Sequence, residues 1–103
     1  MKLFLTASIL GLALAGSAFA DAAAGKVIYM AKCKACHGPT GEGVAAIAKM
    51  KGVTMKALGS KEVQAKTDAQ LKKDSIAGTG KMGPVKLTDA EAGDVVAFLR
   101  TLK

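Results

Sequence analysis

Cys33-Lys34-Ala35-Cys36-His37 is the stretch of this 103-residue chain that says most about its fold. It places two thiols three residues apart and an imidazole directly after the second, which is the pattern of covalent haem attachment. Each thiol can add to one vinyl group of a haem, and the adjacent histidine can then bind the iron. We therefore expect Cys33 and Cys36 to form thioethers, and His37, the only histidine, to be an axial iron ligand.

Three other chemistries use a Cys-x-x-Cys pattern, and each fits this chain less well. A thioredoxin-type dithiol is expected near a βαβ pattern, which the sequence lacks. A structural zinc site usually has four ligands, whereas Cys33, Cys36 and His37 supply three. A disulfide between the two cysteines would close a loop too short to restrict the unfolded chain much. The pattern therefore favours haem.

The first twenty residues have the pattern of a secretory signal peptide. Met1-Lys2 is a short positive start, residues 3–15 are almost wholly apolar, and Ala18-Phe19-Ala20 is a small-x-small cleavage site. Residues 3–20 are also about long enough to span a membrane, so a retained anchor is the alternative. Because polar and glycine residues dilute the apolar stretch, we expect residues 1–20 to be cleaved and residues 21–103 to be an exported domain without stable membrane insertion.

This domain is small and short of large apolar side chains. Chains of its size seldom bury enough surface without a staple, a metal or a cofactor. Only Tyr29 and Phe98 remain as aromatic residues once Phe4 and Phe19 leave with the leader. A flat, largely apolar haem would complete such a core.

The rest of the sequence predicts helices joined by glycine-rich loops and no period-two strand. Two of the helix starts are marked by capping boxes, in which a threonine is followed three residues later by Glu or Gln. The expected helices cover residues 22–32, residues 44–51, the segment from Thr67-x-x-Gln70 to Ile76, and the segment from Thr88-x-x-Glu91 to Leu102.

Gly25 lies inside the first expected helix, where glycine costs about 1 kcal/mol relative to alanine. Close approach of another helix would explain this cost. The C-terminal helix is the expected partner, because Val95, Val96, Leu99 and Leu102 recur in it at helical spacing.

After the leader the chain contains, in this order, Gly25, Tyr29, Cys33-x-x-Cys36-His37-Gly38, Gly78-Thr79-Gly80-Lys81-Met82-Gly83-Pro84, Leu87-Thr88, Phe98 and Leu99. In this order the features resemble the small monohaem class I cytochromes c of the bacterial periplasm. The resemblance covers nearly all of the chain after the leader. It implies an all-α cytochrome c fold, with about four short helices around one covalently bound haem c and the N- and C-terminal helices packed together.

The resemblance also implies a methionine as the second axial ligand. Met30 would lie on the helix that carries the cysteines, on the same side of the iron as His37. Met50 and Met55 have lysine neighbours, and either could cover the haem edge. Met82 lies in a glycine- and proline-rich loop, where the family's distal methionine occurs. We therefore expect His37 and Met82 to be the axial ligands.

A His/Met pair would fill both axial positions and leave no site for a substrate. The sequence therefore predicts a soluble one-electron carrier and not an enzyme, with a haem that cycles between the ferric and ferrous states. The alternative is a haem enzyme or gas sensor with an open sixth coordination site. A second histidine is lacking, and the only arginine, Arg100, belongs to the C-terminal helix, so we favour the carrier.

The sequence departs from the family at one point. Class I members usually place a proline about a dozen residues after the haem histidine, and its carbonyl accepts a hydrogen bond from the imidazole. Residues 45–50 contain no proline, and Pro39 comes too early. Another backbone carbonyl could orient His37, and the sequence leaves its identity open.

The formal net charge of +7, which loses one unit with Lys2, indicates negatively charged partners. Lys32, Lys34, Lys81 and Lys86 flank the two ligand-bearing segments and could ring the haem edge. A positive rim speeds encounter with negative surfaces, so we expect redox proteins with acidic docking surfaces as partners. Export and the shortage of aromatic residues argue against nucleic acid. A monomer is expected for so small a carrier.

Overall fold

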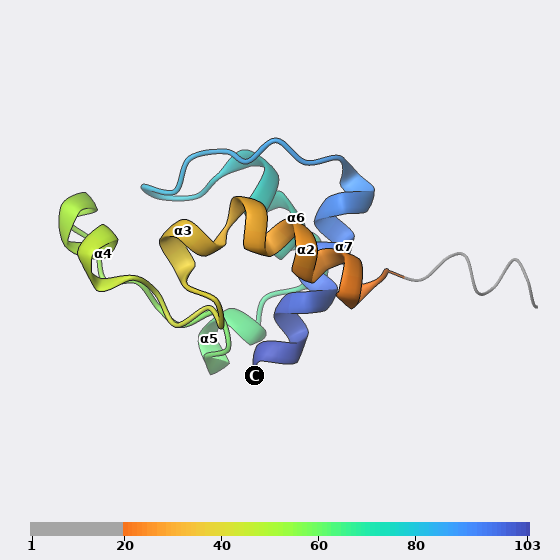
Figure 1. The fold of residues 1–103 in the computed structure, drawn as a ribbon, viewed down its shortest axis with the longest axis horizontal. Coiled ribbons are helices and arrows are strands. Elements are labelled where there is room, and N and C mark those ends of the chain that lie inside the picture. The colour runs from red at the N-terminus through yellow and green to blue at the C-terminus, as the bar shows by residue number, and fades with distance from the viewer. Residues whose placement is uncertain (1–19) are drawn as a thin grey trace, which may run out of the picture.

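The computed structural model describes residues 20–103, and the regular elements of this part of the chain are helices (Figure 1). Between residues 20 and 103 there is no strand, and one isolated bridge joins Thr79 to Met82. The helices are α2 (Ala22–Lys32), α3 (Lys34–His37), α4 (Ala45–Lys51), α5 (Lys61–Gln64), α6 (Asp68–Ala77) and α7 (Asp89–Leu99), followed by a 3-10 turn, η2 (Arg100–Leu102).

The four expected helices correspond to α2, α4, α6 and α7. The two four-residue helices α3 and α5 are additional, because single turns are too short to leave a periodic pattern. The predicted leader, apart from Ala20, lies outside the described residues. Within the described residues, no helix is long and apolar enough to cross a membrane.

The crossing of α2 and α7 forms the centre of the molecule (Figure 1). Gly25 is buried in this crossing, and a Cβ at that position would collide with the backbone carbonyl of Asp94. Asp21 reinforces the contact, because its side chain caps α2 and its backbone N–H donates to the Asp94 carboxylate at 2.9 Å. The prediction that Gly25 allows a close helix approach is thus confirmed.

A small apolar core lies along this crossing. Its buried members are Tyr29 from α2 and Val95, Phe98 and Leu99 from α7. The rings of Tyr29 and Phe98 lie 5.0 Å apart and are tilted by 52°, within the range of favourable aromatic pairs. The two aromatic residues left after the leader therefore pack against each other.

The two predicted capping boxes differ. At α7, the Thr88 side chain accepts from the Glu91 N–H and the Glu91 carboxylate accepts from the Thr88 N–H, so this box is complete. That hydrogen bond from the backbone also lowers the pKa of Glu91. At α6 only the threonine half forms, because the Gln70 side-chain amide donates to Asp74 at 2.7 Å instead of returning to Thr67.

Arg100 joins the end of α7 to the segment between α5 and α6. Its guanidinium donates to the Gln64 carbonyl at 2.9 Å, to the Lys66 carbonyl at 2.7 Å and to the Asp68 carboxylate at 2.7 Å. The only arginine of the chain thus pairs with the carbonyl of the last residue of α5 and with a carbonyl of the segment that follows it.

We expect Gly25→Ala to lower the free energy of unfolding by about 1–3 kcal/mol, the usual cost of overpacking, because the new methyl group would push α7 away. Gly93→Ala is the matched control within α7, since a Cβ there meets nothing within 4 Å. It should raise the stability by up to about 1 kcal/mol through helix propensity. Denaturant unfolding of the haem-loaded variants measures both, and equal effects at the two positions would contradict the tight crossing.

Candidate functional site

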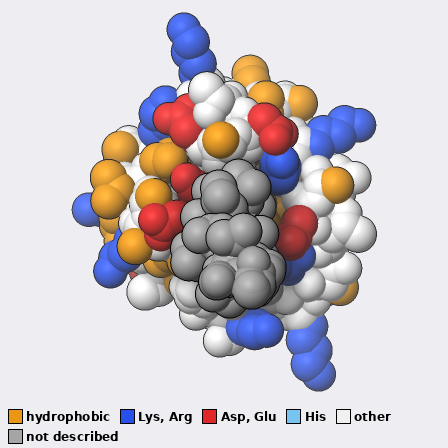
Figure 2. Space-filling view, turned by 90° about the vertical axis from the view of Figure 1, so that its right-hand side faces the viewer, with side chains coloured by type: hydrophobic (Ala, Val, Ile, Leu, Met, Phe, Trp, Pro, Cys, Tyr) orange, Lys and Arg blue, Asp and Glu red, His pale blue; other side chains and the backbone are white. Residues whose placement is uncertain are grey.

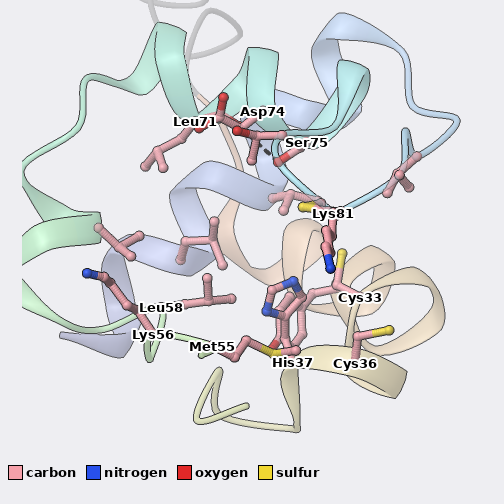
Figure 3. Close-up of a pocket in the computed structure, with 18 of the residues that line it drawn as sticks. Cys33, Cys36, His37, Met55, Lys56, Leu58, Leu71, Asp74, Ser75 and Lys81 are labelled. Atoms are coloured by element: carbon pink, nitrogen blue, oxygen red, sulfur yellow. Dashed lines mark hydrogen bonds between the residues drawn. The ribbon is translucent and has the colours of Figure 1, made fainter. Parts of the chain in front are cut away.

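A cavity of about 540 Å³ lies beside the α2–α7 crossing (Figure 3). This volume is within the usual range of small-molecule and cofactor sites. All four residues singled out in the sequence, Cys33, Cys36, His37 and Met82, line it. Much of the remaining wall is aliphatic and comprises Val53, Leu58, Val63, Leu71, Val85, Val95 and Leu99.

The haem motif occupies the turn where α2 ends and α3 begins. Cys33 is both the last cap of α2 and the first cap of α3, and its carbonyl accepts from the backbone N–H of His37 at 3.0 Å. Cys33 and Cys36 are free, half-buried thiols. Burial raises the pKa of the Cys33 thiol. This single helical turn brings both sulfurs and the imidazole to the same cavity, as Figure 3 shows.

His37 is a half-buried imidazole whose pKa is lowered by burial. It is therefore held in the neutral form, which keeps a lone pair for a metal. Its Nδ1 atom is buried and has no hydrogen-bond partner among residues 20–103. The structure therefore identifies no acceptor for this nitrogen within residues 20–103, and the segment in which the family usually has a proline forms α4 instead. The carbonyls of Ala48 and Lys49 in α4 accept from Val53 and Gly52.

The methionines separate into three environments. Met82 and Met55 line the cavity, Met30 packs against the core, and Met50 is exposed. From the sequence alone, either Met50 or Met55 could cover a haem edge. In the structure, Met55 lines the cavity and Met50 does not. Met55 packs against Gly43, whose N–H donates to the His37 carbonyl at 2.7 Å.

Tight backbone contacts fix the Met82 segment. Thr79 and Met82 exchange two backbone hydrogen bonds of 2.9 and 3.0 Å. Gly78 has a φ of 82°, and a Cβ there would collide with the Met82 carbonyl. Val85 donates to the Ser75 carbonyl of α6 at 3.2 Å. The loop is therefore a closed turn held against α6, and its glycine is required by geometry.

Comparison with known proteins agrees with this architecture. The family described as Cytochrome c matches residues 22–103. The chain belongs to the cytochrome c family. Cytochrome c-554(547) of Halothiobacillus neapolitanus is 34% identical over 89 residues, which cover 81% of this chain and 98% of the relative. Cytochrome c-555 of Chlorobaculum tepidum is 36% identical over 103 residues, which cover 96% of this chain and 95% of the relative.

This cytochrome c is therefore an electron carrier whose cofactor is a covalently bound c-type haem. The residues present fit that group. Two thiols and a neutral imidazole face one cavity with aliphatic walls, which is the donor set and the environment that a haem requires.

Tyr29 holds the backbone next to the haem motif. Its side chain is fully buried, and its hydroxyl donates a hydrogen bond to the carbonyl of Gly38, the residue after His37. Burial raises the pKa of Tyr29 to about 12. The sequence identified Tyr29 as part of the family pattern but not this contact, which joins α2 to the end of α3 across the cavity wall.

The lysines around the cavity differ in part from those expected. Lys32 and Lys81 line it as predicted. Lys34 and Lys86 do not, although they are close in sequence to residues that do. Lys51, Lys56 and Lys66 line it instead. Within residues 20–103, Lys56 and Lys66 pair with Glu62 and Asp74, whereas the other three lining ammonium groups donate to backbone carbonyls. Among residues 20–103, Lys51 and Lys81 have no carboxylate within ion-pair distance, whereas Lys32 lies close enough to Glu91 to help lower the pKa of that carboxyl.

We expect Tyr29→Phe to lower the free energy of unfolding by about 0.5–1.5 kcal/mol, because the Gly38 carbonyl loses the phenol as a donor and keeps only the Gly41 N–H at 3.2 Å. The loss should shrink at high pH. The phenol ionises near its ordinary value of 10 in the unfolded chain and near 12 in the folded one, so its contribution is complete below about pH 10 and is lost as the pH rises toward 12.

Urea unfolding of both proteins at pH 7 and pH 11 measures this difference. Tyr29 is the only tyrosine, so the pH difference spectrum of the phenolate, taken against Tyr29→Phe to remove the haem background, reports this residue alone. A transition near pH 10 in the folded protein would contradict the buried hydrogen bond.

Proposed function

We propose that Cys33 and Cys36 form the two thioethers of the haem and that His37 and Met82 are its axial ligands. The observation that carries this proposal is the convergence of all four side chains on one cavity from two segments far apart in the sequence. When bound, the haem iron supplies a centre that accepts and returns one electron. The protein holds the cofactor, excludes water with aliphatic walls and presents lysines at the rim.

Met82 is a better ligand candidate than Met55, the other methionine of the cavity. Met55 packs against Gly43, and the Gly43 N–H donates to the His37 carbonyl. Met55 therefore lies beside the segment that carries His37. Met82 comes from the separate loop after α6 and is fixed there by its bonds to Thr79. An axial pair needs two ligands on opposite faces of the haem, which favours the loop that is independent of His37.

With both axial positions filled, the iron has no place for a substrate, so we propose a carrier and not an enzyme. The sole arginine supports this proposal, because Arg100 does not line the cavity and its guanidinium is engaged by the Gln64 and Lys66 carbonyls. The single histidine is used as a ligand, which leaves no second imidazole for acid–base chemistry on a bound molecule.

The setting we propose is the periplasm, with residues 1–20 removed after export and residues 21–103 acting as a monomeric cytochrome c domain. The thioether chemistry agrees with export, because it uses both cysteines. The partners are redox proteins with acidic docking surfaces, which Lys51 and Lys81 at the cavity rim would attract.

Met82→Leu tests the ligand assignment and preserves the volume of the side chain. The ferric variant should lose the far-red absorption band of sulfur-ligated haem, and the reduced variant should bind carbon monoxide readily. Met55→Leu is the control and should keep the band and resist carbon monoxide. A band that survives in Met82→Leu would refute the assignment, and uptake of carbon monoxide by the unmodified reduced protein would favour the open-site alternative.

Export is tested by isolating the protein from the periplasm of an expressing bacterium. The expected amino-terminal sequence begins at Asp21, and the expected mass equals that of residues 21–103 plus one haem. A product that retains residues 1–20 and sediments with membranes would show an anchor instead.

A further inference from the structure

Helix α4 stands apart from the rest of the molecule (Figure 1). It makes no extensive contact with another helix of the described chain. Its last residue, Lys51, nevertheless lines the haem cavity. The Lys51 ammonium donates to the Lys81 carbonyl at 3.5 Å, and the Lys81 ammonium donates to the Lys51 carbonyl at 3.0 Å. The end of α4 is therefore joined to the loop that carries Met82.

The outer face of α4 exposes a large apolar side chain. Met50 is 72% exposed, although buried positions are the usual place for methionine. Ala46 and Lys49 are also exposed. Because residues three and four apart lie on one face of a helix, Ala46, Lys49 and Met50 form a continuous surface. We call this face, together with Lys51 and Lys81, the α4 surface.

The charges of the molecule are unevenly divided. Residues 43–61 contain four lysines and no Asp or Glu. Within residues 20–103, no carboxylate lies within ion-pair distance of Lys49, Lys51 or Lys81. The opposite end holds the carboxylates at the starts of α2 and α7, and Figure 2 shows acidic side chains on that face, interspersed with several basic ones. The α4 surface is therefore the end that an acidic partner would meet first.

We propose that the α4 surface is where this cytochrome c docks onto a redox partner protein, whose matching surface has carboxylates around an apolar contact for Met50. This inference rests on the proposed function. Charge complementarity selects an acidic partner, and the apolar centre with a charged rim is the usual composition of a protein interface. Docking here places the partner beside Lys51, at the cavity edge next to the Met82 loop, so that the path for the electron is short.

Two substitutions in the α4 surface, each with a matched control, test the proposal. Met50→Glu is compared with Val27→Glu, because Val27 is 71% exposed on α2 and does not line the cavity. Lys49→Glu is compared with Lys26→Glu, which changes the charge of the molecule equally. The probe is an acidic plant-type [2Fe–2S] ferredoxin, and stopped-flow absorbance gives the second-order rate of reduction of the ferric cytochrome at several salt concentrations.

Met50→Glu and Lys49→Glu should slow the reaction by about tenfold at low salt and flatten its salt dependence, as expected when steering toward the docking site is lost. The two controls should change the rate by less than about twofold. Equal losses in variants and controls would overturn the proposal, because net charge alone would then govern the rate.

A second reductant separates this inference from the proposed function. Neutral hydroquinone needs no docking surface and should reduce all five proteins at the same rate. A haem that no reductant converts reversibly would refute electron transfer itself. Binding to anionic phosphatidylglycerol vesicles that depends on Met50, together with unchanged ferredoxin rates, would show that the α4 surface binds membranes and not proteins.

Discussion

The contact between Gly25 and the backbone of Asp94 is the constraint on which the rest of the structure depends. It lets α2 and α7 cross at backbone distance, and this crossing sets the direction of α2. The haem motif follows α2 without a loop, because Cys33 ends that helix and begins α3. A shift of α2 would therefore move both thiols and the imidazole together.

The same crossing connects the core with the cofactor cavity. Tyr29, Val95 and Leu99 are buried core residues and also line the cavity. A haem bound in this cavity would contact the side chains that hold the two helices together and would extend a core that is small in the protein alone. Because the chain has few aromatic residues, it can bury too little apolar surface by itself. The haem would supply the apolar surface that is missing.

The parts of the fold that could be predicted from the sequence depend on local rules. The haem motif, the complete capping box at Thr88 and the αL glycine that ends α4 at Gly52 are all encoded within a few residues. The contacts that the sequence did not reveal join distant segments. Nothing near Tyr29 identifies the Gly38 carbonyl as its acceptor, and Lys51 enters the cavity lining only because the chain folds back beside the Met82 loop.

The absence of proline from residues 45–51 affects the surface of the molecule through helix α4. A proline within residues 45–51 would interrupt this helix, and the chain has none there. The helix forms, and its Ala48 and Lys49 carbonyls accept hydrogen bonds from Val53 and Gly52, the residues that follow it. The same helix projects from the molecule and exposes Met50 among lysines. The absence of proline therefore permits a helix here, and the helix in turn places Met50 and Lys49 together on the α4 surface.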